Sequence, residues 1–252
     1  MGFPSVGRYL KMLLFCSIPI VVFSQQDQED SIALENARLY ITRLHNSYID
    51  KESGLYNGRQ YVVYAHTISE GTPFLIASNE MDNGSIEYDG ILYENVPLRY
   101  DILKNMIVTR VPATNYLVQL NNEKTTAFSI ENRHFKKLEK DTAYNTLKAG
   151  FYEILYDGKC KAYKKQLKTL GEDLSGSKLR TFIIDATDYY LQKGNRYIVI
   201  NNRKALLAAF RDKKKDIQSF LKKNKLNFRD DKDGVLAKTA AYYDQLSTTH
   251  TN

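Results

Sequence analysis

Four short turn sequences constrain the fold of this chain more than any other feature. Each of them separates two runs that are rich in β-branched and aromatic residues; they are Asp89-Gly90, Asn121-Asn122, Asp157-Gly158 and Gly194-Asn195. Asn, Asp and Gly tolerate the positive φ that a type I′ turn needs at both central residues, so each pair predicts a β-hairpin. No long helical pattern lies between the strands, which argues against parallel βαβ units. The sequence therefore predicts an antiparallel meander from about Tyr61 to Ile200.

Helical patterns flank the predicted sheet. Ser31–Tyr48 has apolar residues at helical spacing, which indicates a short amphipathic helix before the strands. Three further helices are expected after Ile200: Lys204–Arg211 capped by Asn201 or Asn202, Lys213–Lys223 capped by Asp212, and Asp231–Leu246 capped by Asp230. The Gly/Ser-rich segment Gly171–Ser177 is expected to be a loop. The predicted fold class is mainly β (α+β), with a small C-terminal helical cap.

The N-terminal segment has the pattern of a secretory signal peptide. Residues 1–12 contain two basic residues, Arg8 and Lys11, and no acidic one, and a short uncharged apolar run follows up to Phe23. This run is shorter than the roughly 18 residues that a membrane-spanning helix needs. We expect cleavage after Ser24, so that the mature chain begins at Gln25.

Two alternatives to a cleaved signal remain open. Cys16 follows two leucines and Phe15, which suggests a lipoprotein signal. Lipoprotein processing prefers a small residue before the cysteine, and Phe15 is large. The other alternative is an uncleaved N-terminal anchor, because Ser24 is only an adequate cleavage residue.

Three parts are expected along the chain: a signal peptide at 1–24, an N-terminal helix with a β domain at 25–200, and a helical cap at 201–252. A hydrophobic content of 43% and a charged content of 26% are ordinary for a globular protein. Cys160 is the only cysteine after the signal, which excludes an intramolecular disulfide in the mature chain. We interpret Cys160 as a buried, small hydrophobic residue rather than as a nucleophile.

Charge is divided unevenly along the chain. Residues 25–132 contain 8 Lys and Arg against 15 Asp and Glu, whereas residues 133–252 contain 26 against 14. A basic half would favour nucleic acid as a partner in the cytoplasm. For an exported protein the expected anions are instead lipid phosphate, lipopolysaccharide or an acidic protein, and a solvated basic surface is the simpler interpretation.

Of all segments of the chain, residues 213–225 most resemble a surface that binds a partner. Ile217, Phe220 and Leu221 form its apolar side. The candidate anion-binding residues are its six lysines: Lys213, Lys214, Lys215, Lys222, Lys223 and Lys225. Such a helix can lie on an anionic membrane surface. Because its apolar stripe is narrow, we favour the alternative in which that side packs on the sheet and the lysines face solvent.

Recognisable catalytic and cofactor motifs are absent from the sequence. It has no Gly-rich phosphate loop, no dinucleotide fingerprint and no GxSxG motif. The four histidines, at 45, 66, 134 and 250, lack the spacing of a zinc site. Several carboxylates are candidates for an acid–base pair that the fold would have to assemble: Asp89, Glu94, Asp101 and Asp157. No cofactor, metal or catalytic residue is predicted.

Several stretches of the chain carry a resemblance to a known group. They are Leu55–Gly58, Gly71–Phe74, Gly84–Asp101, Gly150–Gly158 and the Tyr-Tyr-Asp that ends at Asp244. The chain resembles a group of uncharacterised exported proteins of the Bacteroidota, with Gly84–Asp101 as the most specific stretch. The resemblance implies a Gram-negative periplasm or outer-membrane setting and no particular activity. In that setting Ser31 and Thr142, each following an Asp and preceding an apolar residue, look like O-glycosylation sites of that phylum.

These observations together predict an exported cell-envelope protein, periplasmic or associated with the outer membrane. Its expected role is non-enzymatic: a binding or assembly component whose partner is an envelope protein or an anionic lipid or glycolipid, and not nucleic acid. Two alternatives remain open. One is an envelope hydrolase with a carboxylate acid–base pair, and the other is a lipid or glycolipid carrier.

Overall fold

The structure is a computed structural model that describes residues 54–64, 68–78, 80–174 and 179–248, together with residues 34, 36–38, 40 and 41. The chain forms two compact units, Met1–Ile41 and Thr42–Asn252. The described residues of the first unit are helical, in agreement with part of the helix predicted over Ser31–Tyr48. The rest of that helix and the predicted signal peptide lie outside the described residues.

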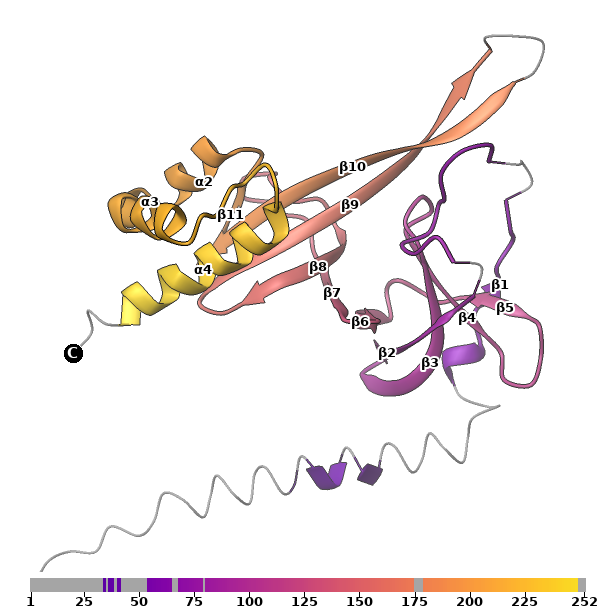
Figure 1. Cartoon of the computed structure of the whole chain (residues 1–252). Helices are drawn as coiled ribbons and strands as arrows, with labels where there is room; N and C mark the ends of the chain where they lie inside the picture. The colour runs from indigo at the N-terminus through magenta and orange to yellow at the C-terminus, as the bar shows by residue number, and fades with distance from the viewer. Residues whose placement is uncertain are drawn as a thin grey trace, which may run out of the picture. The chain divides into compact units, whose positions relative to one another are not determined.

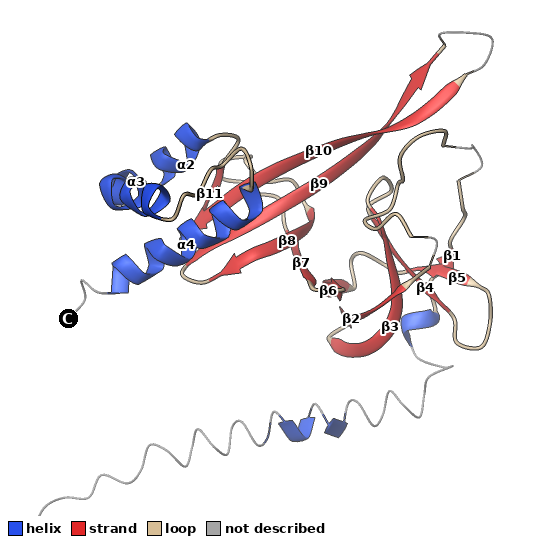
Figure 2. Ribbon diagram, viewed as in Figure 1, coloured by secondary structure: helices blue, strands red, loops and turns tan. Residues whose placement is uncertain are grey.

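The described strands of the second unit form one sheet in which every neighbouring pair is antiparallel (Figure 1, Figure 2). Its order is β1-β5-β4-β3-β2-β6-β7-β8-β9-β10-β11. The strands are β1 (Arg59–Gln60), β2 (Asp82–Tyr88), β3 (Ile91–Asp101), β4 (Met106–Arg110), β5 (Leu117–Gln119), β6 (Thr125–Ile130), β7 (Arg133–Leu138), β8 (Gly150–Asp157), β9 (Cys160–Asp173), β10 (Arg180–Lys193) and β11 (Arg196–Val199). The prediction of a mainly β, antiparallel fold is confirmed. The sheet consists of two meanders, β2–β5 and β6–β11, that are joined where β2 pairs with β6.

Two of the four predicted hairpins form at the expected dipeptides, one of them with the expected type I′ turn. Asp89 and Gly90 connect β2 to β3 with φ of 55° and 77°, the positive values that a type I′ turn requires. Gly194 and Asn195 connect β10 to β11, but only Gly194 has a positive φ, at 59°. That pattern is typical of a type II′ turn.

The hairpin predicted at Asn121-Asn122 is wrong. These residues connect β5 to β6, which do not pair, because both edges of β5 are already occupied by β4 and β1. The segment turns locally, since the Lys124 amide donates to the Asn121 carbonyl at 3.1 Å. The Asn122 side chain donates to the Asn105 carbonyl at 2.7 Å and so holds the connection against the β3–β4 turn.

The turn predicted at Asp157-Gly158 is displaced. The hairpin β8–β9 exists, but Asp157 still belongs to β8 and pairs with Lys161, and neither turn residue has positive φ. The cause is the Asp244 carboxylate, which accepts hydrogen bonds from the Cys160 amide at 3.0 Å and from the Tyr156 hydroxyl at 3.2 Å. A Cβ on Gly158 would overlap this carboxylate and the Tyr156 side chain, so any larger residue there would displace them.

Strands β9 and β10 form a long two-stranded ribbon (Figure 1). β8 pairs with β9 only as far as Lys164, and beyond it β9 continues against β10 to Asp173. The loop predicted at Gly171–Ser177 is therefore wrong in its first three residues, which are strand. The Phe182 ring covers Gly171 so closely that a Cβ there would clash, an arrangement in which a cross-strand aromatic shields a strand glycine.

Three α-helices and a short 3-10 helix lie beside the last strands (Figure 2). They are α2 (Arg203–Ala209), η2 (Arg211–Lys213), α3 (Lys214–Lys223) and α4 (Lys232–Thr248). The Asn202 side chain caps α2 by accepting from the Ala205 amide at 2.9 Å, as predicted. The other two predicted caps are wrong: Asp212 binds Lys193 and Tyr243 instead of capping α3, and Asp231 rather than Asp230 accepts from the Gly234 amide.

Apolar side chains gather in separate clusters along the sheet. One cluster lies on β2–β8, where the rings of Tyr100, Phe128, Phe135 and Phe151 contact one another at centroid distances of 4.6 to 6.0 Å. Another joins the helices to β9–β11 and contains Cys160, which is 2% exposed. The expected burial of Cys160 is confirmed, and this burial raises the pKa of its thiol to about 12.

Candidate functional site

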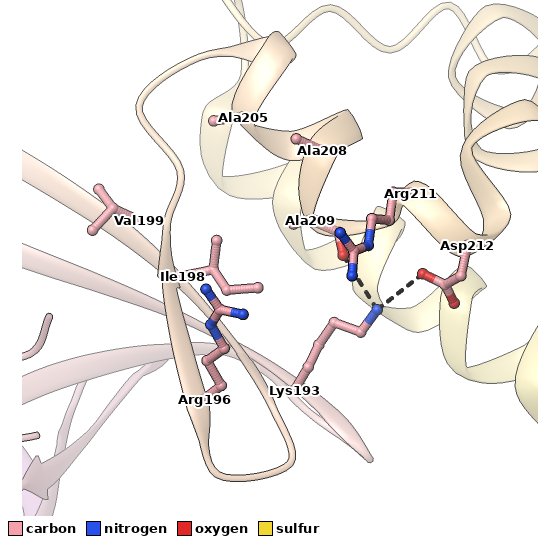
Figure 3. Close-up of a pocket in the computed structure, with 9 residues that line it drawn as sticks. All are labelled: Lys193, Arg196, Ile198, Val199, Ala205, Ala208, Ala209, Arg211 and Asp212. Atoms are coloured by element: carbon pink, nitrogen blue, oxygen red, sulfur yellow. Dashed lines mark hydrogen bonds and ion pairs between the residues drawn. The ribbon is translucent and has the colours of Figure 1, made fainter. Parts of the chain in front are cut away.

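A groove lies between strand β11 and helix α2, and we call it the β11–α2 groove (Figure 3). Its volume is about 430 Å³, within the range of ligand pockets in proteins. The residues that line it are Lys193, Arg196, Ile198, Val199, Ala205, Ala208, Ala209, Arg211 and Asp212. The lining thus combines small apolar side chains with four charged ones.

The local sequence explains why the groove is open. Ala205, Ala208 and Ala209 recur at helical spacing along one side of α2, and their small side chains leave room beside the strand. Leu206 and Phe210 are fully buried in the helical cluster, and their packing fixes the helix in place. The alternation of a β-strand brings the side chains of Arg196 and Ile198 to the same face.

Two of the charged residues neutralise each other at the end of the groove. The Lys193 ammonium donates to Asp212 at 3.1 Å and to the Ala209 carbonyl at 3.2 Å, as Figure 3 shows. The Tyr243 hydroxyl also donates to Asp212, at 2.7 Å. Burial alone would raise the pKa of Asp212, but these hydrogen bonds outweigh it and lower that pKa below its usual range. The pair therefore stays ionised and braces η2 against β10.

Two further cations, Arg196 and Arg211, line the groove beside the Lys193–Asp212 pair. Arg196 and Arg211 are both exposed, and within the described part of the chain neither forms an ion pair. Arg196 lies over the Tyr144 ring, with the guanidinium carbon 5.5 Å from the ring centroid. A guanidinium without a carboxylate partner can bind an incoming carboxylate or phosphate by two parallel hydrogen bonds.

The lysines singled out in the sequence lie on α3 and at its two ends. Ile217 and Leu221 are buried in the helical cluster, and Phe220 stacks on Tyr242 of α4 at 4.2 Å. Lys213 is half-buried, whereas five lysines are exposed: Lys214, Lys215, Lys222, Lys223 and Lys225. The apolar side is thus buried, as in the interpretation that the sequence favoured. The lysines enlarge the positive surface around α2 and α3 without lining the groove.

Three of the four candidate acid–base carboxylates have separate partners, and the fourth, Glu94, is exposed on β3. Asp89 pairs with Lys124 and Asp157 with Lys161, both at hairpin ends. Asp101 is fully buried and accepts from the hydroxyls of Tyr61 and Tyr64. Asp101 thus anchors the segment that precedes β2.

The other candidate residues from the sequence are the two possible O-glycosylation sites and the histidines. Thr142 is exposed in a turn where the Asp141 carboxylate accepts from two backbone amides, and Ser31 lies outside the described residues. His134 is exposed in β7, and the other three histidines are not described. Within the described ranges no three His, Cys, Asp or Glu side chains are grouped so that they could hold a metal ion. None of the helices described there is long and apolar enough to cross a bilayer.

The sequence did not single out the residues of the groove. Arg196 and Arg211 lie outside the lysine-rich segment, and only the helical spacing of the three alanines hinted at an open helix side. Comparison with known proteins adds no site by analogy, because no protein-family model, no curated protein and no solved structure matches this chain.

Proposed function

We propose that this protein is an exported, non-enzymatic binding or assembly component of the cell envelope, and that it contacts an anionic partner through the β11–α2 groove. The location rests on the signal-peptide pattern of residues 1–24 and on the resemblance to exported Bacteroidota proteins. The binding role rests on the groove itself.

The observation that carries this proposal is the pair of exposed arginines beside small apolar side chains. Arg196 and Arg211 provide charge without a carboxylate in the described chain, whereas Ile198 and the alanines of α2 provide an apolar wall. This combination suits a ligand that is both anionic and partly apolar, such as a protein segment with acidic side chains. The exposed lysines of α3 add long-range attraction for the same partner, which raises the rate of encounter.

The two alternative functions receive less support from the described residues. Of the carboxylates considered for a hydrolase, Asp89, Asp101 and Asp157 each have a separate structural partner, which leaves no assembled acid–base pair among these three. A lipid carrier needs an extended apolar lining. The apolar lining of the groove is limited to Ile198, Val199 and the alanines.

Site-specific photo-crosslinking in the native cells tests the proposal. A photoreactive phenylalanine analogue is placed at Ala208 in the groove and, as a matched control, at Thr126, which is exposed on β6. We expect an adduct from position 208 that is lost when Arg196 and Arg211 are both changed to Glu. An adduct that forms equally from position 126, or that survives the double charge reversal, would contradict the proposal.

A further inference from the structure

Strand β11 is the last strand of the sheet, and its outer edge has free hydrogen-bonding groups. Lys193 and Arg196 face each other across the two-residue turn, and the Ile200 amide donates to the Tyr189 carbonyl at 2.8 Å. Antiparallel pairs alternate between hydrogen-bonded and non-hydrogen-bonded ones, so the main-chain groups of Tyr197 and Val199 face away from β10. Among the described residues no hydrogen bond uses these outward groups.

This edge lacks two of the features by which proteins usually prevent strand pairing, proline and a β-bulge. Its sequence is Arg-Tyr-Ile-Val, and Val199 is 41% exposed. The opposite edge of the sheet, β1, is only two residues long, which is itself a protection.

The same side of the sheet already accepts an extended segment of this chain. Beyond β11, the Ser69 amide donates to the Thr181 carbonyl at 2.7 Å, and the Ile183 amide donates to the Glu70 carbonyl at 3.0 Å. Residues 69 and 70 thus cover the outer edge of β10 near the far end of the ribbon. The corresponding edge at β11 has no such cover in the described chain.

We propose that an extended segment of a partner protein, carrying acidic side chains, adds to β11 as a further strand and places those side chains in the β11–α2 groove. The inference rests on the proposed function, and it specifies the partner and its geometry. The main chain of the incoming segment pairs with Tyr197 and Val199. Its side chains alternate, so every second one faces α2, where Arg196 and Arg211 attract carboxylates and the alanines leave space.

A second copy of this chain is a poorer occupant of the same edge. Pairing of β11 with itself would bring two copies of Arg196 and Arg211 close to each other, and like charges repel. Charge complementarity therefore favours an acidic partner over self-association.

The variant Val199→Pro tests strand addition without disturbing the pairing of β10 with β11. Because the Val199 amide faces outward, proline removes the donor for an added strand and leaves the β10–β11 hydrogen bonds intact. Val199→Thr is the matched control, since it keeps the amide and the β-branched shape. The probe is a library of random linear 12-residue peptides displayed on phage, selected on the full-length mature protein.

The expected binders alternate apolar and acidic residues. We expect their affinity to fall at least about tenfold in Val199→Pro, which corresponds to about 1.4 kcal/mol, and to fall by much less in Val199→Thr, which keeps the outward amide. Amide hydrogen exchange at Tyr197 and Val199 in the wild-type protein should slow on binding. This second readout does not depend on the folding of any variant.

Four outcomes would overturn the inference. Binders that need Arg196 and Arg211 but are indifferent to Val199→Pro would contradict strand addition and leave the proposed function standing. A selection without binders, or exchange at Tyr197 and Val199 that is unaffected by bound peptide, would also contradict it. Self-association that Val199→Pro abolishes would make a second copy the occupant instead.

Discussion

At the scale of single residues, the buried carboxylate of Asp244 on α4 holds the β8–β9 connection through the Cys160 amide. The Asp244 carboxylate displaces a turn that the dipeptide Asp157-Gly158 would otherwise have formed at its usual place. Tertiary contacts from a helix 84 residues away in the chain therefore override local turn preference. The burial of Cys160, in contrast, followed from composition alone, because a lone thiol without a His partner usually packs as a small hydrophobic residue.

Asp244→Ala should destabilise the protein substantially. The substitution leaves the Cys160 amide and the Tyr156 hydroxyl without their acceptor, and lost hydrogen bonds to a charged group cost about 1.5–3 kcal/mol. Urea unfolding measures the change. The control is Asp216→Ala. Asp216 is exposed on α3, so this substitution should change the free energy of unfolding by less than about 0.5 kcal/mol. Equal effects from the two would refute the anchoring role of Asp244.

Lys165 should make the stability depend on pH above neutrality. It is 8% exposed, donates to the Phe151 carbonyl at 3.0 Å and forms no ion pair in the described chain. Burial lowers the pKa of its ammonium to about 8 from the usual 10.5. Between these two values the unfolded chain binds more protons than the folded one, so stability from this group rises with pH.

Lys165→Met removes this dependence. The variant should be more stable than the wild type at neutral pH, and the difference should shrink as pH rises from about 8 to about 10. Unfolding in urea at several pH values measures it, and exposed Lys204→Met serves as the control. A stability difference that stays constant over this pH interval would contradict the lowered pKa.

At the scale of elements, local signals predict the strands and helices but not their partners. Asp89-Gly90 and Gly194-Asn195 form hairpins because the two strands that each dipeptide connects pair with each other in the sheet. The Glu131-Asn132 turn between β6 and β7 carries no glycine and was not foreseen, although Glu131 adopts a φ of 53°. The failure at Asn121-Asn122 has another cause: the pairing of β5 with β1 and β4 depends on residues far away in the chain.

Gly90→Val tests the turn that the sequence predicted best. Gly90 has a φ of 77°, where a β-branched residue is strained, so the substitution should cost about 1–3 kcal/mol. Gly54→Val is the control, because no atom lies within 4 Å of a Cβ built there and its φ is not positive. Thermal unfolding of both variants measures the difference. Equal melting temperatures would argue against the strained turn.

At the scale of the whole molecule, the fold class was predictable and the binding site was not. Alternating apolar residues and turn dipeptides are local, so an antiparallel β fold with C-terminal helices follows from sequence. The groove forms where a strand edge meets a helix, and Arg196 and Arg211 lie on different elements. The lysines of α3 can be recognised as a basic segment because they lie close together in the sequence. The residues of the groove come from separate elements and meet only in the folded chain.

For the whole molecule, we predict that the chain is exported and that its signal peptide is removed. If residues 1–24 are removed as a signal peptide, protein purified from its native cells should begin at Gln25 and fractionate outside the cytoplasm. N-terminal sequencing together with intact mass measures this. A cytosolic chain that begins at Met1 would contradict the envelope assignment and reopen nucleic acid as a partner of the basic half.

An amide NMR titration tests the central claim most directly, because it separates the groove from the lysine-rich helix. The ¹⁵N-labelled mature protein is titrated with the acidic peptide that the library selection yields. The account predicts that the largest shifts fall on the amides of Tyr197 and Val199 in β11 and of Ala208 in α2. Shifts confined to Lys214–Lys223 of α3 would contradict it and place the anionic partner on the basic helix.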